Sequence, residues 1–188
     1  MRWDALFDDM EAQLAARQRL DFEAEVAERA LVDAAKVELA DRLRGSLGLS
    51  IRVHVSSGAA FEGALSHAGS EALVLDEPMH QVLIPYAAAA QFAGLSRLAV
   101  PEPSRVRQRL GLGSALRGLA GSRTPVTILV ARGRAEAEQH GVLDTVGRDF
   151  LDLAVIREGE DRRTGVRQVV TIPFAALAAI RSVSAAGN

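Results

Sequence analysis

The hydrophobic positions at the start of the chain follow a helical period. Residues 3–47 contain no proline and no glycine before residue 45, and they are rich in Ala, Glu, Leu, Arg and Gln, all of which favour helix. Trp3, Phe7, Met10 and Leu14 are spaced four, three and four residues apart, so they lie along one side of a helix. The spacing slips around residues 17–21. The pattern therefore predicts either one long helix with a slip or two helices that break near Leu20.

Beyond residue 48 the period changes to that of β-strands. The segment "IRVHV" at 51–55 alternates apolar and polar side chains, as a half-buried strand does. Further strands are predicted at 71–75, 82–85, 126–131, 149–156 and 167–173. A joint with two prolines, "PEPS" at 101–104, separates two halves, and a short basic helix is predicted after it.

The second half repeats the first. "GALSHAGSEALVL" at 63–75 and "GVLDTVGRDFLDL" at 141–153 share glycine at their first and seventh positions and leucine at their third, eleventh and thirteenth. "LRGSLG" at 43–48 matches "LRGLAG" at 116–121, and "IPYAAAAQFAG" at 84–94 matches "IPFAALAAIRS" at 172–182. These matches keep one order and the insertions fall in predicted turns, which indicates a repeated supersecondary unit.

The repeated glycines suggest where the backbone bends. Gly63 and Gly141 open a strand that must bend sharply or admit a neighbouring backbone closely. Gly69 and Gly147 fall in tight turns, where we expect positive φ.

A helix followed by five short bent strands, with a glycine opening the second strand and an Ile-Pro turn late in the unit, resembles the Sm-like fold of Sm, LSm and Hfq proteins. The resemblance covers 33–98 and 104–183. It implies an α+β protein in which a long N-terminal helix is followed by two tandem Sm-like (SH3-like) five-stranded small β-barrels. We expect a helical region at 1–45, a first barrel at 46–100, and a second barrel at 101–188 with its own short N-terminal helix.

The resemblance also carries expectations about function. Sm-like proteins mostly bind RNA, and they assemble by pairing the last strand of one barrel with the fourth strand of the next. The open strands of the two barrels are expected to pair either with each other or with those of other chains, which would make a homo-oligomer.

Composition narrows the chemistry. About half of the residues are apolar, which suffices for a core. The absence of cysteine excludes disulfides, thiolate metal sites and a cysteine nucleophile. The sequence carries no glycine-rich phosphate loop or nucleophile elbow, and its four histidines form no constellation. We therefore expect no enzyme, no cofactor and no metal site. No apolar stretch reaches the length of a membrane span, and a cytoplasmic location is expected.

Charge is distributed unevenly along the chain. Residues 1–44 carry 11 acidic and 7 basic side chains, a net charge of −4, whereas residues 101–188 carry 9 acidic and 13 basic side chains, a net charge of +4. The basic half can attract the acidic half or face an anionic partner such as RNA.

Arginines of the second half are the candidate nucleic-acid-binding residues. Four of them lie on the predicted enlarged hairpin: Arg157, Arg162, Arg163 and Arg167. Three acidic residues lie among them, so this hairpin is either an RNA contact or a self-neutralised loop. Arg148 adds to the basic surface. By the resemblance, Arg181 lies near the place where Sm proteins carry the arginine of their RNA pocket.

The N-terminal segment is the candidate partner-binding element. Its apolar residues Trp3, Phe7, Met10 and Leu14 can dock in the groove of a protein partner, pack on the chain's own barrel or form a dimeric coiled coil. The sequence thus predicts a non-catalytic RNA-binding or RNA-associated regulatory protein. The alternative is a protein–protein interaction scaffold or assembly factor that does not bind nucleic acid.

Overall fold

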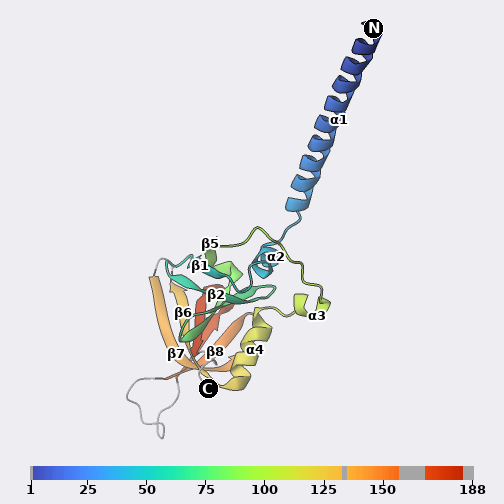
Figure 1. The fold of residues 1–188 in the computed structure, drawn as a ribbon. Coiled ribbons are helices and arrows are strands. Elements are labelled where there is room, and N and C mark those ends of the chain that lie inside the picture. The colour runs from blue at the N-terminus through green and yellow to red at the C-terminus, as the bar shows by residue number, and fades with distance from the viewer. Residues whose placement is uncertain (1, 133–134, 157–167, 184–188) are drawn as a thin grey trace. The chain divides into compact units, whose positions relative to one another are not determined.

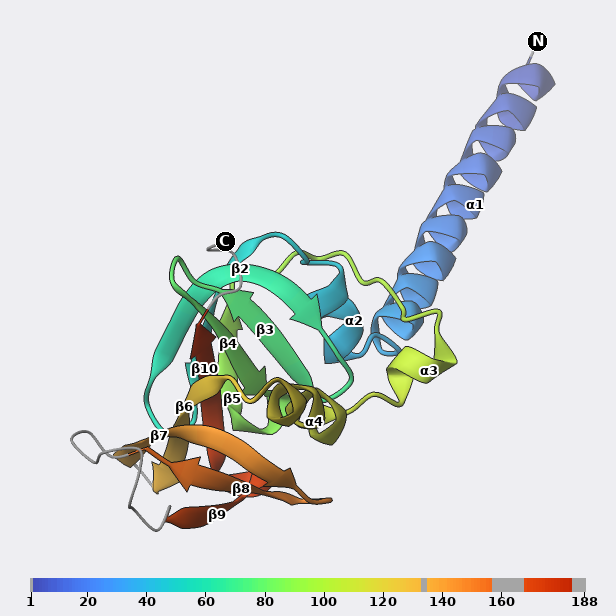
Figure 2. The same cartoon turned by 90° about the horizontal axis from the view of Figure 1, so that it is seen from below.

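The chain has two compact units in the computed structural model, residues 1–38 and residues 39–188. The structure describes residues 2–132, 135–156 and 168–183. Figures 1 and 2 together label the helices α1 to α4 and the strands β1 to β10.

The first unit is a single helix, α1 (Arg2–Ala34), of 33 residues. It runs without a break through Leu20, so the sequence pattern corresponds to one helix with a slip rather than to two helices. Every side chain of α1 that the structure describes is exposed to solvent.

The second unit is built on one antiparallel sheet. Its helices and strands are α2 (Leu39–Arg44), β1 (Ser50–Val55), β2 (Ala60–Ala68), β3 (Ala72–Asp76), β4 (His80–Pro85), η1 (Tyr86–Ala88), β5 (Ala89–Ala93), α3 (Arg105–Gln108), α4 (Leu112–Ser122), β6 (Pro125–Arg132), β7 (Ala135–Val146), β8 (Phe150–Val155), β9 (Val169–Pro173), η2 (Phe174–Ala176) and β10 (Leu177–Val183). The ten strands follow the order β5-β1-β2-β3-β4-β10-β6-β7-β8-β9.

The prediction of a helix followed by two closed five-stranded barrels is wrong. The strands form one open ten-stranded sheet, whose edges are β5 and β9. The physical reason is the pairing of β4 with β10, in which Leu83 lies opposite Ile180 and His80 opposite Val183. This pairing, called the seam below, joins the two halves into one sheet. The sequence left open whether the outer strands of the two halves pair with each other or with another chain. The described strands show pairing within the chain.

The seam also joins the cores of the halves. One cluster of buried side chains, built mainly from β1 to β4, includes Leu129, Ala178 and Ala179 of the second half. The other cluster, built mainly from β6 to β10, includes Ala72 and Leu83 of the first half. Figure 2 shows β10 between β4 and β6, where its alternating side chains reach both clusters.

The two halves have the same internal strand order. Each places its last strand beside its first, followed by its second, third and fourth strands. The register shift after Leu65 in β2 recurs after Leu143 in β7, 78 residues later. The helices before each half contribute equivalent buried leucines, Leu43 of α2 and Leu116 of α4, both fully buried.

The basic helix predicted after the proline joint is in fact two short helices, α3 and α4. Leu112 and Leu116 of α4 are buried, whereas Val106 and Leu110 lie before α4 and are exposed. Gly111 is the N-cap of α4 and has an extended backbone, so the chain turns between the two helices.

The glycine predictions have mixed outcomes. A Cβ on Gly63 would lie 2.5 Å from the carbonyl oxygen of Asp76, and one on Gly141 would lie 2.4 Å from that of Ala154. Both positions therefore admit a neighbouring backbone closely, as expected. The positive φ predicted for Gly69 and Gly147 is wrong, because the described glycines with positive φ are Gly48, Gly58 and Gly94. At Gly147 the ring of Phe150 instead occupies the space that a side chain would need. Its nearest atom lies 2.3 Å from the position of an added Cβ.

Candidate functional site

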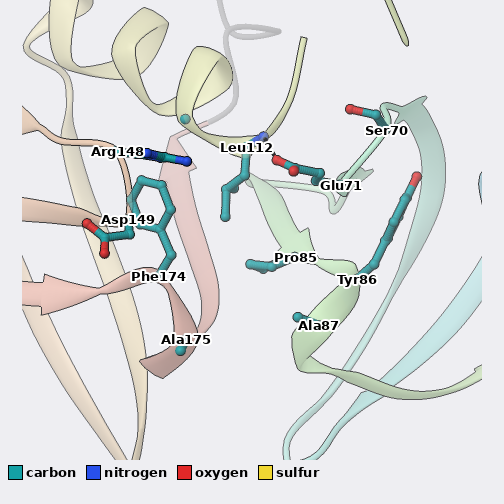
Figure 3. A pocket seen from close by; sticks show the side chains of 11 residues that line it. Ser70, Glu71, Pro85, Tyr86, Ala87, Leu112, Arg148, Asp149, Phe174 and Ala175 are labelled. Carbon is teal, nitrogen blue, oxygen red and sulfur yellow. Dashed lines mark hydrogen bonds between the residues drawn. The ribbon is translucent and has the colours of Figure 1, made fainter. Parts of the chain in front are cut away.

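A pocket of about 440 Å³ lies where the repeated turns of both halves meet the start of α4. Figure 3 shows the residues that line it, which are Ser70, Glu71, Pro85, Tyr86, Ala87, Leu112, Gly113, Arg148, Asp149, Phe174 and Ala175. Each half contributes the turn between its second and third strands together with its single 3-10 turn. The pocket is therefore lined by pairs of repeat-equivalent positions.

The same backbone hydrogen bond builds both sides of the pocket. The Tyr86 N–H donates to the Glu71 carbonyl oxygen over 2.8 Å, and the Phe174 N–H donates to the Asp149 carbonyl oxygen over 2.8 Å. The Ile-Pro sequence places each 3-10 turn directly after a strand, because proline needs no hydrogen-bond acceptor there. The two halves thus share the same backbone arrangement at the pocket, and its two walls differ only in their side chains.

The carboxylate of Glu71 makes a structural contact with the start of α4. Its Oε2 accepts a hydrogen bond of 2.7 Å from the Leu112 N–H, which is one of the unpaired donors at the start of α4. A carboxylate at this end also interacts favourably with the helix dipole. The approach requires Gly111, since a Cβ there would lie 2.2 Å from the Glu71 carboxylate. Ser70 adds a hydrogen bond of 3.1 Å from its Oγ to the Leu110 carbonyl oxygen.

Tyr86 is held in the pocket wall as a neutral phenol. Its hydroxyl donates a hydrogen bond of 2.8 Å to the Gly69 carbonyl oxygen. Burial raises the pKa of Tyr86 to about 12, and the positive charge of Arg44 offsets part of that rise. The hydroxyl therefore keeps its proton at neutral pH and is unsuited to act as a base there.

Arg148 is the cation of the pocket. Its side chain is exposed and forms no ion pair with the residues that the structure describes. Figure 3 shows it extending past the ring of Phe174 towards Leu112, while the carboxylate of Asp149 points away from the cavity. An arginine beside an aromatic ring can contact an anionic or a flat ligand.

Of the two candidate arginines that the structure describes, Arg148 lines this pocket and Arg181 does not. Arg181 is in β10, where its Nη2 lies 3.5 Å from Glu77 Oε2 and its guanidinium carbon lies 5.7 Å from the centre of the Phe61 ring. The Nε of Arg181 is buried without a hydrogen-bond partner among the described residues. Arg181 is thus committed to the packing at the seam. Arg157, Arg162, Arg163 and Arg167 lie outside the described residues.

Helix α1 carries the candidate partner-binding residues. Met10 and Leu14 are 57 % and 58 % exposed. The backbone of Trp3 and Phe7 is helical, and their side chains lie outside the described residues. Leu20 and Leu31, further along α1, are 65 % and 73 % exposed. The exposed apolar surface therefore extends beyond the four positions that the sequence singled out.

Sequence reasoning missed the role of Glu71 and the contribution of α4 to the pocket. The acidic residues Glu71 and Asp149 are repeat-equivalent, and that recurrence was the available signal. A contact between Glu71 and Leu112, 41 residues apart, leaves no local pattern.

Other features bear on the class of protein. No helix in the part of the chain that the structure describes is long and apolar enough to cross a membrane. The described residues also contain no group of three His, Cys, Asp or Glu side chains placed to hold a metal ion. No protein-family model matches the chain, and a comparison with curated proteins finds no similar sequence.

Proposed function

We propose that this protein is a non-catalytic assembly factor that binds another protein chain through α1. The observation that carries the proposal is the solvent exposure of large apolar side chains along this helix, including Leu14, Leu20 and Leu31. Isolated helices have marginal stability in water, and most helices gain stability by packing an apolar face. Contiguous exposed apolar side chains typically mark interaction sites.

Photo-crosslinking in cells tests this proposal. A photo-crosslinking amino acid at position 14 of the full chain is expected to form a covalent adduct with a protein, because the partner covers this face of α1. The control places the same amino acid at position 97, since Arg97 is exposed in a loop of the second unit. If only the free chain is recovered with the crosslinker at positions 14, 20 and 31 in turn, the proposal is wrong.

A second candidate function is RNA binding. It is favoured by Arg148, which has no ion pair with the described residues and lies beside Phe174, with Tyr86 across the same pocket. Bases of single-stranded RNA stack on aromatic rings and arginine planes, and the phosphates attract cations. The strand order shared by the two halves supports an internal duplication.

Arg148→Ala is expected to weaken binding of a short single-stranded RNA by about 10-fold at low salt, since one stacking and phosphate contact is lost. The slope of log K against log [salt] should become shallower by about 0.7. Arg97→Ala removes the same charge elsewhere on the second unit and should leave affinity nearly unchanged. Fluorescence anisotropy measures both effects. Equal losses in the two variants would mean that the pocket is not the site.

A further inference from the structure

One edge strand of the sheet, β5, is the repeat equivalent of β10, which forms one side of the seam. β5 pairs with β1 as β10 pairs with β6, because Phe92 lies opposite Val53 and its equivalent Ile180 lies opposite Ile128. Both pairings also pass over one residue of the last strand, at equivalent positions. The β5 edge of the sheet therefore repeats the β10 edge that the seam uses.

The other edge strand, β9, repeats β4 in the same way. β9 pairs with β8 so that Ile172 lies opposite Leu151, and β4 pairs with β3 so that Ile84 lies opposite Leu73. The second unit thus carries one edge of each kind that the seam joins, with β5 at one end of its strand order and β9 at the other.

The equivalent strands differ in solvent exposure as this relation predicts. Residues 177–180 of β10 are all buried, whereas the equivalent residues 89–92 of β5 are half-buried or exposed. Leu83 of β4 is buried, whereas its equivalent in β9, Thr171, is exposed, and Val169 of the same strand is 51 % exposed. Among the described residues, the surfaces that the seam covers are therefore left uncovered at the two edges.

Neither edge strand carries the charges that commonly keep the edges of sheets from pairing. β5 has the sequence "AAQFA" and β9 has the sequence "VVTIP", whereas natural proteins often place lysine or other charged residues on an open edge. The one proline, Pro173, is the last residue of β9, and its equivalent Pro85 lies outside the residue pairs of the seam. Pro173 would therefore leave a pairing of the seam type intact.

The seam contains an ion pair whose two members are both missing at the edges. Arg181 of β10 contacts Glu77, which follows β3 in the first half. The repeat-equivalent residues are Ala93 and Val155, both uncharged. An edge-to-edge contact would therefore bury no unpaired charge, which would otherwise oppose it strongly.

We propose that β5 of one copy of this chain pairs antiparallel with β9 of another copy, in the register of the seam. Moving the register of the seam to the equivalent strands sets Phe92 opposite Thr171 and Ala93 opposite Val170. A second copy fits these edges because each chain supplies both members of the pairing, and the seam joins strands of the same two kinds. The proposal concerns the second unit and does not depend on the partner of α1.

The proposed contact is head to tail. Each copy that is added leaves one β5 edge and one β9 edge open, so the assembly grows until it closes as a ring, or continues as a filament if it does not close. Thr171 replaces Leu83 of the seam, which makes the contact less apolar. We therefore expect a reversible assembly whose mass rises with protein concentration.

Engineered cysteines test the register, because the chain has no cysteine of its own. Opposed residues of antiparallel strands have Cα atoms about 4.5–5.5 Å apart, which a disulfide can bridge. We expect Ala93→Cys and Val170→Cys chains to link to each other when mixed under oxidising conditions. Neither variant alone should link, since each then lacks one member of the contact. Ser122→Cys, at the exposed end of α4, is the control and should not link to Ala93→Cys.

Sedimentation velocity of the full chain over a range of concentrations tests the assembly itself. Thr171→Lys places a charge on the open edge and is expected to raise the concentration needed for half-assembly about 10-fold. Thr145→Lys is the matched control, because Thr145 is also exposed but lies in β7, which is paired on both sides. It should change this concentration less than about twofold. Urea unfolding checks that both variants are folded.

The outcomes separate this inference from the proposed function. A chain that stays monomeric and forms no link between Ala93→Cys and Val170→Cys overturns the edge pairing, even where α1 crosslinks to another protein. Linking of Ala93→Cys to itself also overturns it, because like edges would then meet. An assembly that Thr171→Lys leaves unchanged does so as well. Correct edge links in a chain without any α1 adduct would instead refute the proposed function alone.

Discussion

Replacing Gly141 with alanine is expected to lower the free energy of unfolding by about 3 kcal/mol. The added Cβ would lie 2.4 Å from the Ala154 carbonyl oxygen and 2.8 Å from Leu153 Cγ. Backbone contacts this short can be relieved only by moving the strand, and β8 is fixed by its pairing with β7 on one side and β9 on the other. Gly63→Ala should have a similar cost, since its Cβ would lie 2.5 Å from the Asp76 carbonyl oxygen.

Urea unfolding followed by the emission of Tyr86, the single tyrosine, measures these losses. Gly118→Ala is the control. Gly118 lies inside α4 with no atom within 4 Å of its added Cβ, so alanine there should be neutral or stabilise by up to about 1 kcal/mol. If Gly141→Ala were as stable as Gly118→Ala, the close approach of β7 and β8 would not be what selects glycine.

These glycines illustrate what the sequence can predict. A glycine repeated at equivalent positions indicates a steric demand, and that demand was identified correctly at Gly63 and Gly141. The prediction that they open their strands is wrong, because Gly63 lies within β2 and Gly141 lies within β7. The glycine of a tight turn gives a weaker signal, because such turns form with several backbone geometries. At Gly147 the requirement comes from the ring of Phe150, three residues away, and not from φ.

Local periodicity located six of the ten strands, β1, β3, β4, β6, β8 and β9, but it could not show how the strands join. Whether five strands close on themselves or continue into a neighbour depends on which edge β4 meets, and β10 is about 100 residues away in the sequence. Either arrangement buries the same alternating side chains, so the hydrophobic pattern does not distinguish them. The prediction of two closed barrels failed at this non-local step.

The pocket could not be predicted from the sequence for a similar reason. Its walls come from two turns, two 3-10 segments and the start of α4, which are distant in the chain and meet only through the sheet. Counting arginines identified the basic half but could not show that Arg181 is committed to Glu77 and Phe61. The apolar residues of α1 follow a local spacing, so the sequence alone could single out positions such as Met10 and Leu14, both of which are exposed.

Ile180→Ala tests whether the seam makes the two halves one cooperative unit. Ile180 is 1 % exposed and lies opposite Leu83 of β4 in the core, so we expect a loss of about 3 kcal/mol from the cavity. The neighbouring Ala178 and Ala179 of β10 belong to the other core cluster, which links the two clusters through one strand. Hydrogen exchange should therefore lose protection equally in β1 to β4 and in β6 to β8.

The control for this substitution is Ile156→Ala, the same change at a side chain that is 52 % exposed, and it should cost less than about 0.5 kcal/mol. Loss of protection confined to the second half in Ile180→Ala would mean that the halves unfold separately, as two barrels would. Equal loss in both halves would mean that the whole sheet depends on β10, since among the described strands of the second half only β10 pairs with the first half. Duplication would then have produced one folding unit whose two halves are free to diverge only at the turns and edges.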